Sequence, residues 1–183
     1  MKDKTKRISK FLSYVLRHNP AEIDLNLDSN GWVSIAQLIS NANAHGKDIN
    51  RKLIEQVVVT NDKQRFAISD DGKMIRANQG HSVEINLDIE PSVPPAVLLH
   101  GTAEKNLGLI TSDGLKKMNR HHVHLSECEE TASAVGQRYG KLVLLEVDTI
   151  KMISDGYEFF KSENDVWLVE SVPSQYISVL QNK

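Results

Sequence analysis

The feature that most constrains the fold is a proline-rich segment near the middle of the chain. Glu90-Pro91-Ser92-Val93-Pro94-Pro95 places three prolines within five residues. Proline fixes its own φ and has no backbone N–H, so such a segment cannot continue a helix or a central strand. The 183-residue chain is therefore predicted to form two lobes, residues 1–90 and 96–183, joined by a linker at residues 91–95.

The first lobe opens with the pattern of an amphipathic helix. Apolar residues recur at the i, i+3, i+4, i+7 and i+8 positions, namely Ile8, Phe11, Leu12, Val15 and Leu16. Pro20 ends this helix, which leaves Arg17 and His18 in its last turn, where the helix dipole favours cations. An arginine fork matches phosphate and an imidazole exchanges protons near neutral pH, so the pair suits an anionic substrate. The alternative is a helix cap without chemistry.

Further helices and a hairpin are predicted in the rest of this lobe. Ser34-Ile35-Ala36-Gln37 has the form of a capping box before a second helix, and a third helix is expected at about 51–59. Strands at 65–69 and 73–77 flank an Asp-Gly turn, which indicates a hairpin. Helices followed by a hairpin predict a winged-helix lobe, an architecture that often binds nucleic acid.

The second lobe is predicted to be richer in strands. An apolar run at 96–99 ends at His100-Gly101-Thr102, and the helical patterns cover 103 to about 110 and 127–139. The remaining patterns indicate strands at 122–126 and 142–147, a hairpin around 162–165 and a last strand at 176–180. We expect a bent mixed sheet here and an α+β fold overall.

Two copies of a short motif stand out in the second lobe. His100-Gly101-Thr102 and His124-Leu125-Ser126 each place a hydroxyl two residues after a histidine. Such pairs resemble the two-histidine phosphoesterases, in which the imidazoles act as acid and base. Alternatively, Thr102 and Ser126 cap the helices that follow them. A helix start can also hold an anion such as a pyrophosphate, so the cap and a ligand contact are compatible.

Composition excludes several classes of function. The net charge of −2 argues against indiscriminate nucleic-acid binding, and a single cysteine excludes an internal disulfide framework. His121, His122 and His124 lack the carboxylate or cysteine spacing of a metal site, so no metal is expected. No apolar run reaches the length of a membrane span, and we expect a cytoplasmic protein. Dinucleotide-binding glycine loops and Walker loops are also missing.

Six motifs in order resemble the RNA 2′-phosphotransferase family of the KptA type. In the first lobe they are Arg17-His18-Asn19-Pro20, Arg65-Phe66 and the segment 75–82. In the second lobe they are His100-Gly101-Thr102, the segment 122–126 and Val166-Trp167-Leu168. The resemblance implies an N-terminal winged-helix lobe that grips RNA and a C-terminal lobe of the ADP-ribosyltransferase fold, which binds NAD without a Rossmann loop.

The resemblance also implies a two-step reaction that consumes NAD. An internal RNA 2′-phosphate attacks C1″ of the nicotinamide ribose, which releases nicotinamide and gives an RNA 2′-phospho-ADP-ribose intermediate. The ribose O2″ then attacks phosphorus, which yields ADP-ribose 1″,2″-cyclic phosphate and RNA with a 2′-hydroxyl. No metal and no obligate protein partner are implied. The rival hypotheses are a winged-helix regulator that binds nucleic acid and a two-histidine cyclic phosphodiesterase.

The family's site residues map onto matching positions of this chain. Its catalytic Arg-His-Arg-Arg quartet corresponds to Arg17, His18, Arg65 and Arg138, with the arginines positioning phosphate and His18 acting on the attacking ribose hydroxyl. The residues implied to line the NAD cleft are His100, Gly101, Thr102, His124 and Ser126. The residues implied to contact RNA are Arg76, Gln79 and His81.

Overall fold

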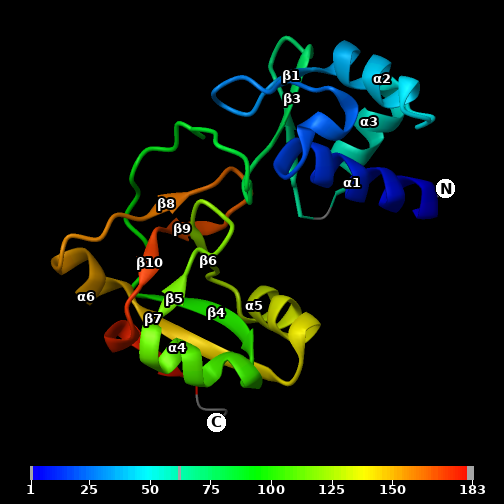
Figure 1. The fold of residues 1–183 in the computed structure, drawn as a ribbon. Coiled ribbons are helices and arrows are strands. Elements are labelled where there is room, and N and C mark those ends of the chain that lie inside the picture. The colour runs from blue at the N-terminus through cyan, green and yellow to red at the C-terminus, as the bar shows by residue number, and fades with distance from the viewer. Residues whose placement is uncertain (1, 62, 181–183) are drawn as a thin grey trace. The chain divides into compact units, whose positions relative to one another are not determined.

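The protein is described by a computed structural model that covers residues 2–61 and 63–180. The chain divides into two compact units, the first ending at Asp88 and the second beginning at Ile89 (Figure 1). Each unit has its own hydrophobic core. Helices dominate the first unit and short strands the second, so the fold is α+β.

Among its described residues, the first unit contains three α-helices, a short 3-10 helix and three strands. In chain order they are α1 (Lys2–Arg17), η1 (Pro20–Ile23), β1 (Val33–Ser34), α2 (Ile35–Ala44), α3 (Arg51–Val59), β2 (Phe66–Ile68) and β3 (Met74–Ala77). The three strands form one antiparallel sheet in the order β1-β3-β2, in which Phe66 lies opposite Ala77. The predicted hairpin is thus confirmed, and β1 adds a third strand to it.

Local sequence signals explain these helices. The apolar stripe of α1 supplies Leu12, Val15 and Leu16, all fully buried, to the core of the first unit. The predicted cap of α2 is confirmed, because the Ser34 hydroxyl accepts a hydrogen bond from the Gln37 amide at 3.4 Å. Asn50 caps α3 in the same way through the Leu53 amide at 2.9 Å. The first helix begins earlier than its apolar pattern indicated, at Lys2.

The second unit contains eight strands and three short α-helices among the described residues. In order they are β4 (Val97–Ala103), η2 (Glu104–Asn106), α4 (Leu107–Asp113), β5 (Leu115–Lys116), β6 (Val123–Leu125), α5 (Glu129–Gly136), η3 (Gln137–Tyr139), β7 (Leu142–Asp148), α6 (Thr149–Ser154), β8 (Phe160–Lys161), β9 (Trp167–Val169), β10 (Ser171–Val172), η4 (Ser174–Tyr176) and β11 (Ile177–Val179). The predicted hairpin is confirmed as β8–β9.

These strands form three small sheets rather than one mixed sheet. Their orders are β11-β7-β4, β6-β9-β8 and β10-β5, and every strand pair of the described residues is antiparallel. The prediction of a mixed sheet is therefore wrong for this part of the chain. Most of these strands span only two or three residues, too few to align in one continuous sheet. The first two sheets are linked by a bridge between Leu99 and Ser126, whose backbones exchange hydrogen bonds of 2.8 and 2.9 Å.

The long strand β4 pairs with β7 along its whole length, from Val97 opposite Asp148 to Ala103 opposite Leu142. The helix expected from 103 to about 110 is confirmed as a helical segment, η2 followed directly by α4, which begins at Glu104 and ends at Asp113. The N-cap residue of η2 is Ala103, and that of α5 is Cys128. Neither side chain accepts a hydrogen bond from an amide of its helix. The capping roles considered for Thr102 and Ser126 are therefore wrong.

Two glycines allow α5 to lie directly on β4. A Cβ on Gly101 would overlap the carbonyl oxygen of Ala132 and lie 2.6 Å from its carbon. A Cβ on Gly136 would lie 2.8 Å from the Thr102 amide nitrogen. Both separations are shorter than real Cβ contacts allow, so these positions admit only hydrogen as a side chain.

Candidate functional site

In the first unit, Arg17 and Arg65 are tied to the same stretch of backbone. Arg17 is the last residue of α1, and its Nη2 donates a hydrogen bond of 3.3 Å to the carbonyl oxygen of Arg65, just before β2. That carbonyl also accepts from the Asn78 amide at 2.9 Å. The Arg65 guanidinium donates to Asn61 Oδ1 at 3.3 Å. The Arg17 guanidinium is thereby anchored to the backbone of Arg65, 48 residues further along the chain.

The segment after β3 closes over the end of α1 and fixes His18. The Ser82 amide donates to the Arg17 carbonyl at 2.9 Å, and the Val83 amide donates to the same oxygen at 3.3 Å. Ser82 Oγ lies 3.0 Å from His18 Nδ1. These bonds continue the hydrogen-bonding of the helix end and orient an exposed imidazole beside Arg17. The cluster of Arg17, His18 and Arg65 has the donors and charge to bind a phosphate.

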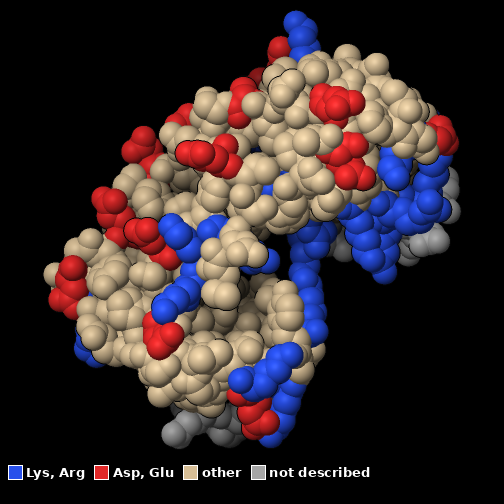
Figure 2. Space-filling view, in the orientation of Figure 1, with Lys and Arg blue, Asp and Glu red and all other residues tan. Residues whose placement is uncertain are grey.

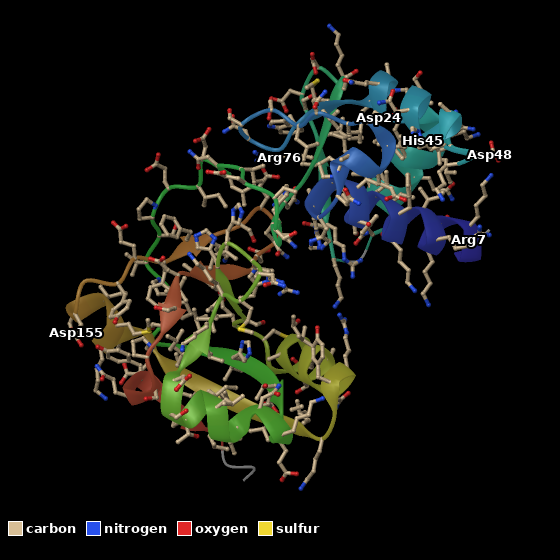
Figure 3. The ribbon with its side chains drawn as sticks, in the orientation of Figure 1. Arg7, Asp24, His45, Asp48, Arg76 and Asp155 are labelled. Atoms are coloured by element: carbon tan, nitrogen blue, oxygen red, sulfur yellow. The ribbon has the colours of Figure 1, made fainter. Side chains whose placement is uncertain are left out.

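The three residues predicted to contact RNA lie in different surroundings. Arg76 is on β3 (Figure 3). Its guanidinium carbon lies 4.6 Å from the centroid of the Trp32 ring, on which it stacks. Gln79 follows β3 and is half-buried. His81 is only 1% exposed and lies beneath Gly31, so its position favours support of the loop over contact with a ligand.

In the second unit, the two histidine motifs meet across the β4–β6 bridge. His100 Nδ1 lies 3.0 Å from the His124 carbonyl oxygen. A carbonyl only accepts, so Nδ1 of His100 carries the proton and Nε2 keeps its lone pair. Burial lowers the pKa of His100, and the charge of Arg120 lowers it further, while the hydrogen bond to His124 opposes both. His100 is therefore a neutral donor and acceptor at pH 7.

Arg120 completes this group of side chains. Its Nη1 lies 3.2 Å from His124 Nδ1, and because a guanidinium only donates, Nδ1 of His124 is the acceptor. Arginine stays charged at every physiological pH. The arrangement places one permanent cation and two histidines whose tautomers are fixed side by side, which suits an anionic ligand with hydrogen-bonding groups.

The other residues predicted for the NAD cleft have mainly local partners. The Thr102 hydroxyl accepts from Asn106 Nδ2 at 3.3 Å, and Thr102 is 5% exposed. The Ser126 hydroxyl accepts from the Cys128 amide at 3.1 Å and orders the turn into α5. Gly101 admits the close approach of α5 described above. The structure thus brings His100, His124 and Ser126 together around the bridge.

Arg138 lies in η3, directly after α5, and is exposed. Its role as the fourth residue of the catalytic quartet stays a prediction. Among the described residues of the second unit, Arg120 is the arginine with a hydrogen bond to the predicted NAD residues. The sequence offered a signal for Arg120, since it precedes three histidines within four residues, but nothing in the pattern distinguished it from the other arginines at turns.

No group of three or more metal-ligating side chains occurs in the part of the chain that the structure describes. Over those same residues, no helix is both long and apolar enough to cross a membrane.

Comparison with known proteins decides the family. Residues 3–171 match the family described as "RNA 2'-phosphotransferase, Tpt1 / KptA family". The chain belongs to this family of enzymes. A relative from Acaryochloris marina is 51% identical over 96% of this chain and 97% of its own length, and one from Pseudomonas fluorescens is 53% identical over 94% and 95%. A third, from Fusobacterium nucleatum, is 46% identical over 96% and 98%. Each is named a probable RNA 2′-phosphotransferase.

The family match covers both groups of side chains. Arg17, His18 and Arg65 lie within the matched residues, as do His100, Arg120 and His124. The sequence had already singled out most of them, whereas Ser82 and Arg120 were assigned no role in the site. Only tertiary contacts identify these two residues: Ser82 contacts His18, and Arg120 contacts His124.

Proposed function

We propose that the protein removes an internal 2′-phosphate from RNA by transferring it to NAD, with nicotinamide and ADP-ribose 1″,2″-cyclic phosphate as products. The observation that carries the proposal is the group of Arg17, His18 and Arg65, whose charges and hydrogen-bond donors suit a phosphate, in a chain of this family. RNA is the substrate that the relatives' names give.

The order of elements supports a finer assignment of the two folds. The first unit runs α1-β1-α2-α3-β2-β3, with β2 and β3 as a hairpin and β1 paired to β3, which is the order expected of a winged helix. In the second unit, two antiparallel sheets are joined by the bridge between Leu99 and Ser126, and α5 packs against β4, an arrangement compatible with an ADP-ribosyltransferase lobe. We assign the units to these two folds.

On the phosphate side, the chain supplies fixed charge. A 2′-phosphate is already an anion and needs alignment rather than a strong base. Arg17 and Arg65 would bind its oxygens and stabilise the charge that builds on phosphorus in the second step. His18, oriented through Nδ1 by Ser82, would contact the ribose hydroxyl that attacks.

On the NAD side, the donor set fits a dinucleotide. NAD supplies an activated C1″–nitrogen bond as the second substrate. Arg120 offers a permanent charge to its pyrophosphate, and the neutral His100 offers a hydrogen-bond acceptor at Nε2. Gly101 and Gly136 let the backbone of α5 approach β4 closely, which holds the loop from Ser126 to α5 against the histidines.

The first test is turnover of a short RNA with one internal 2′-phosphate, with and without NAD and without added metal. We expect loss of the 2′-phosphate only when NAD is present, together with release of nicotinamide and ADP-ribose cyclic phosphate, measured by mass spectrometry. Binding without turnover would favour a nucleic-acid regulator. Phosphodiester hydrolysis without NAD would favour the two-histidine phosphoesterase.

A second prediction separates Arg120 from Arg138. Arg120→Gln removes the charge beside His124, so we expect the KM for NAD to rise at least tenfold, whereas Arg138→Gln should change it less than threefold. Both variants lose one charge from an exposed position of the same unit, so each controls for the other. A rise in the KM for NAD that is larger for Arg138→Gln than for Arg120→Gln would support Arg138 as a member of the quartet and remove Arg120 from the site.

A further inference from the structure

Helix α1 carries a row of basic residues on the face opposite its buried stripe. Lys6, Lys10 and Arg17 are separated by four and seven residues, so they lie within a narrow band along one side of the helix. The side that faces the core is formed by Ile8, Leu12, Val15 and Leu16. Lys6 and Lys10 are exposed, and Arg17, which belongs to the phosphate cluster, is the last member of the row.

Within the described residues, Lys6 and Lys10 lack the carboxylate partners that other basic side chains of this unit have. Lys4 forms an ion pair of 2.7 Å with Asp48, and Arg51 forms one of 2.8 Å with Glu55. Among the side chains that the structure describes, Lys6 and Lys10 form no ion pair. Figure 2 shows Lys and Arg gathered along the margin of the first unit where α1 runs. Two exposed lysines that form no ion pair with a described side chain and lie in line with Arg17 suit a polyanion.

We propose that Lys6 and Lys10 bind backbone phosphates of the RNA strand that flanks the reacting 2′-phosphate. The inference rests on the proposed function, since Arg17 marks where that phosphate binds. At about 1.5 Å per residue, Lys10 lies about 10 Å and Lys6 about 16 Å from Arg17 along the helix. Stacked nucleotides advance by about 3.4 Å each, so the two lysines reach phosphates about three and five nucleotides from the reacting linkage.

The test uses two RNAs, a trinucleotide and a 12-nucleotide strand, each with one internal 2′-phosphate. The variant is Lys6→Gln with Lys10→Gln in the full chain. The matched control is Lys52→Gln with Lys105→Gln, which removes the same charge from exposed lysines on α3 and η2. Turnover is measured at saturating NAD, and binding of the 12-nucleotide RNA is measured by fluorescence anisotropy without NAD over a range of salt concentrations.

We expect the Lys6/Lys10 variant to raise the KM for the longer RNA about tenfold, with kcat and the trinucleotide reaction changed less than twofold. The slope of log affinity against log salt should fall by about 1.4, since each phosphate contact on a single strand contributes about 0.7. The control should match the wild type. Two results would overturn the proposal. One is a KM for the longer RNA that is the same for the Lys6/Lys10 variant and the wild type. The other is a rise in the variant's KM that is equally large for the trinucleotide and the longer RNA.

Failure of the proposed function gives a different result. In that case the wild type turns over neither RNA with NAD. The anisotropy measurement of RNA binding alone then tests whether the two lysines contact phosphates. Weaker binding of the longer RNA by the Lys6/Lys10 variant than by the control still supports them as phosphate contacts. Equal binding by the two variants overturns the proposal.

Discussion

Arg65→Gln is expected to lower kcat/KM for a 2′-phosphorylated RNA by 100-fold to 1,000-fold. The side chain would stabilise negative charge on the transferred phosphate, and loss of one such fixed donor costs about two to three orders of magnitude. The backbone carbonyl of Arg65, which holds Arg17 Nη2 and the Asn78 amide, is retained in the variant. Arg65→Gln should therefore lower kcat/KM while the Arg17 side chain keeps its hydrogen bond to the backbone at position 65.

The control for this variant is Arg51→Gln in the same unit. Arg51 is exposed, pairs with Glu55 and donates to the Gly72 carbonyl at 2.7 Å, away from Arg17 and His18 in the hydrogen-bond network. Its replacement should change kcat/KM less than twofold. Steady-state kinetics and thermal unfolding of both variants make the comparison. An Arg65→Gln enzyme with kcat/KM within threefold of the wild type would remove Arg65 from the catalytic group.

Gly101→Ala is expected to have the largest effect on stability. The added methyl would overlap the Ala132 carbonyl oxygen, which belongs to the backbone of α5 and cannot rotate away. Either α5 moves off β4 or the strand distorts, and the free energy of unfolding of the second unit should fall by at least about 3 kcal/mol. Because β4 carries His100 and α5 follows Ser126, NAD binding should weaken as well.

Each unit contains one of the two tryptophans, which allows the second unit to be followed alone. Urea unfolding monitored by Trp167 fluorescence in a Trp32→Phe background reports on that unit. Gly108→Ala is the control, because a Cβ there meets nothing within 4 Å and the residue lies in α4. It should be neutral or stabilising by about 0.5–1 kcal/mol. A Gly101→Ala protein as stable as the wild type would contradict the packing argument.

Local signals in the sequence were sufficient for much of the first unit. The periodicity of α1, the Ser34 cap and the Asp-Gly turn each depend on residues within one turn or one hairpin, so they can be recognised without knowing the rest of the fold. The adjacency of Arg17 and His18 before Pro20 follows from the same local pattern. The family was likewise recognisable from short motifs in order.

The second unit depended more on contacts distant in sequence. The apolar run from 96 to 99 indicated only a segment that ends at His100-Gly101-Thr102, whereas pairing with β7 makes 97–103 one continuous strand. The caps considered for Thr102 and Ser126 were wrong because the helices begin later in the chain, after Ala103 and Cys128. Separate short antiparallel sheets, rather than a mixed sheet, also follow from pairings that no local pattern encodes.

The sequence by itself determined which side chains could carry the chemistry, because arginine, histidine and glycine have properties that do not depend on the fold. Only the tertiary structure decided which of them meet. His18 contacts Ser82, which is 64 residues further along the chain, and Arg17 donates to the Arg65 carbonyl, which is 48 residues further along. Arg120 is distinguished from other arginines by its hydrogen bond to His124. The physical reason is that hydrogen bonds act over about 3 Å, while the sequence records only the order of residues along the chain.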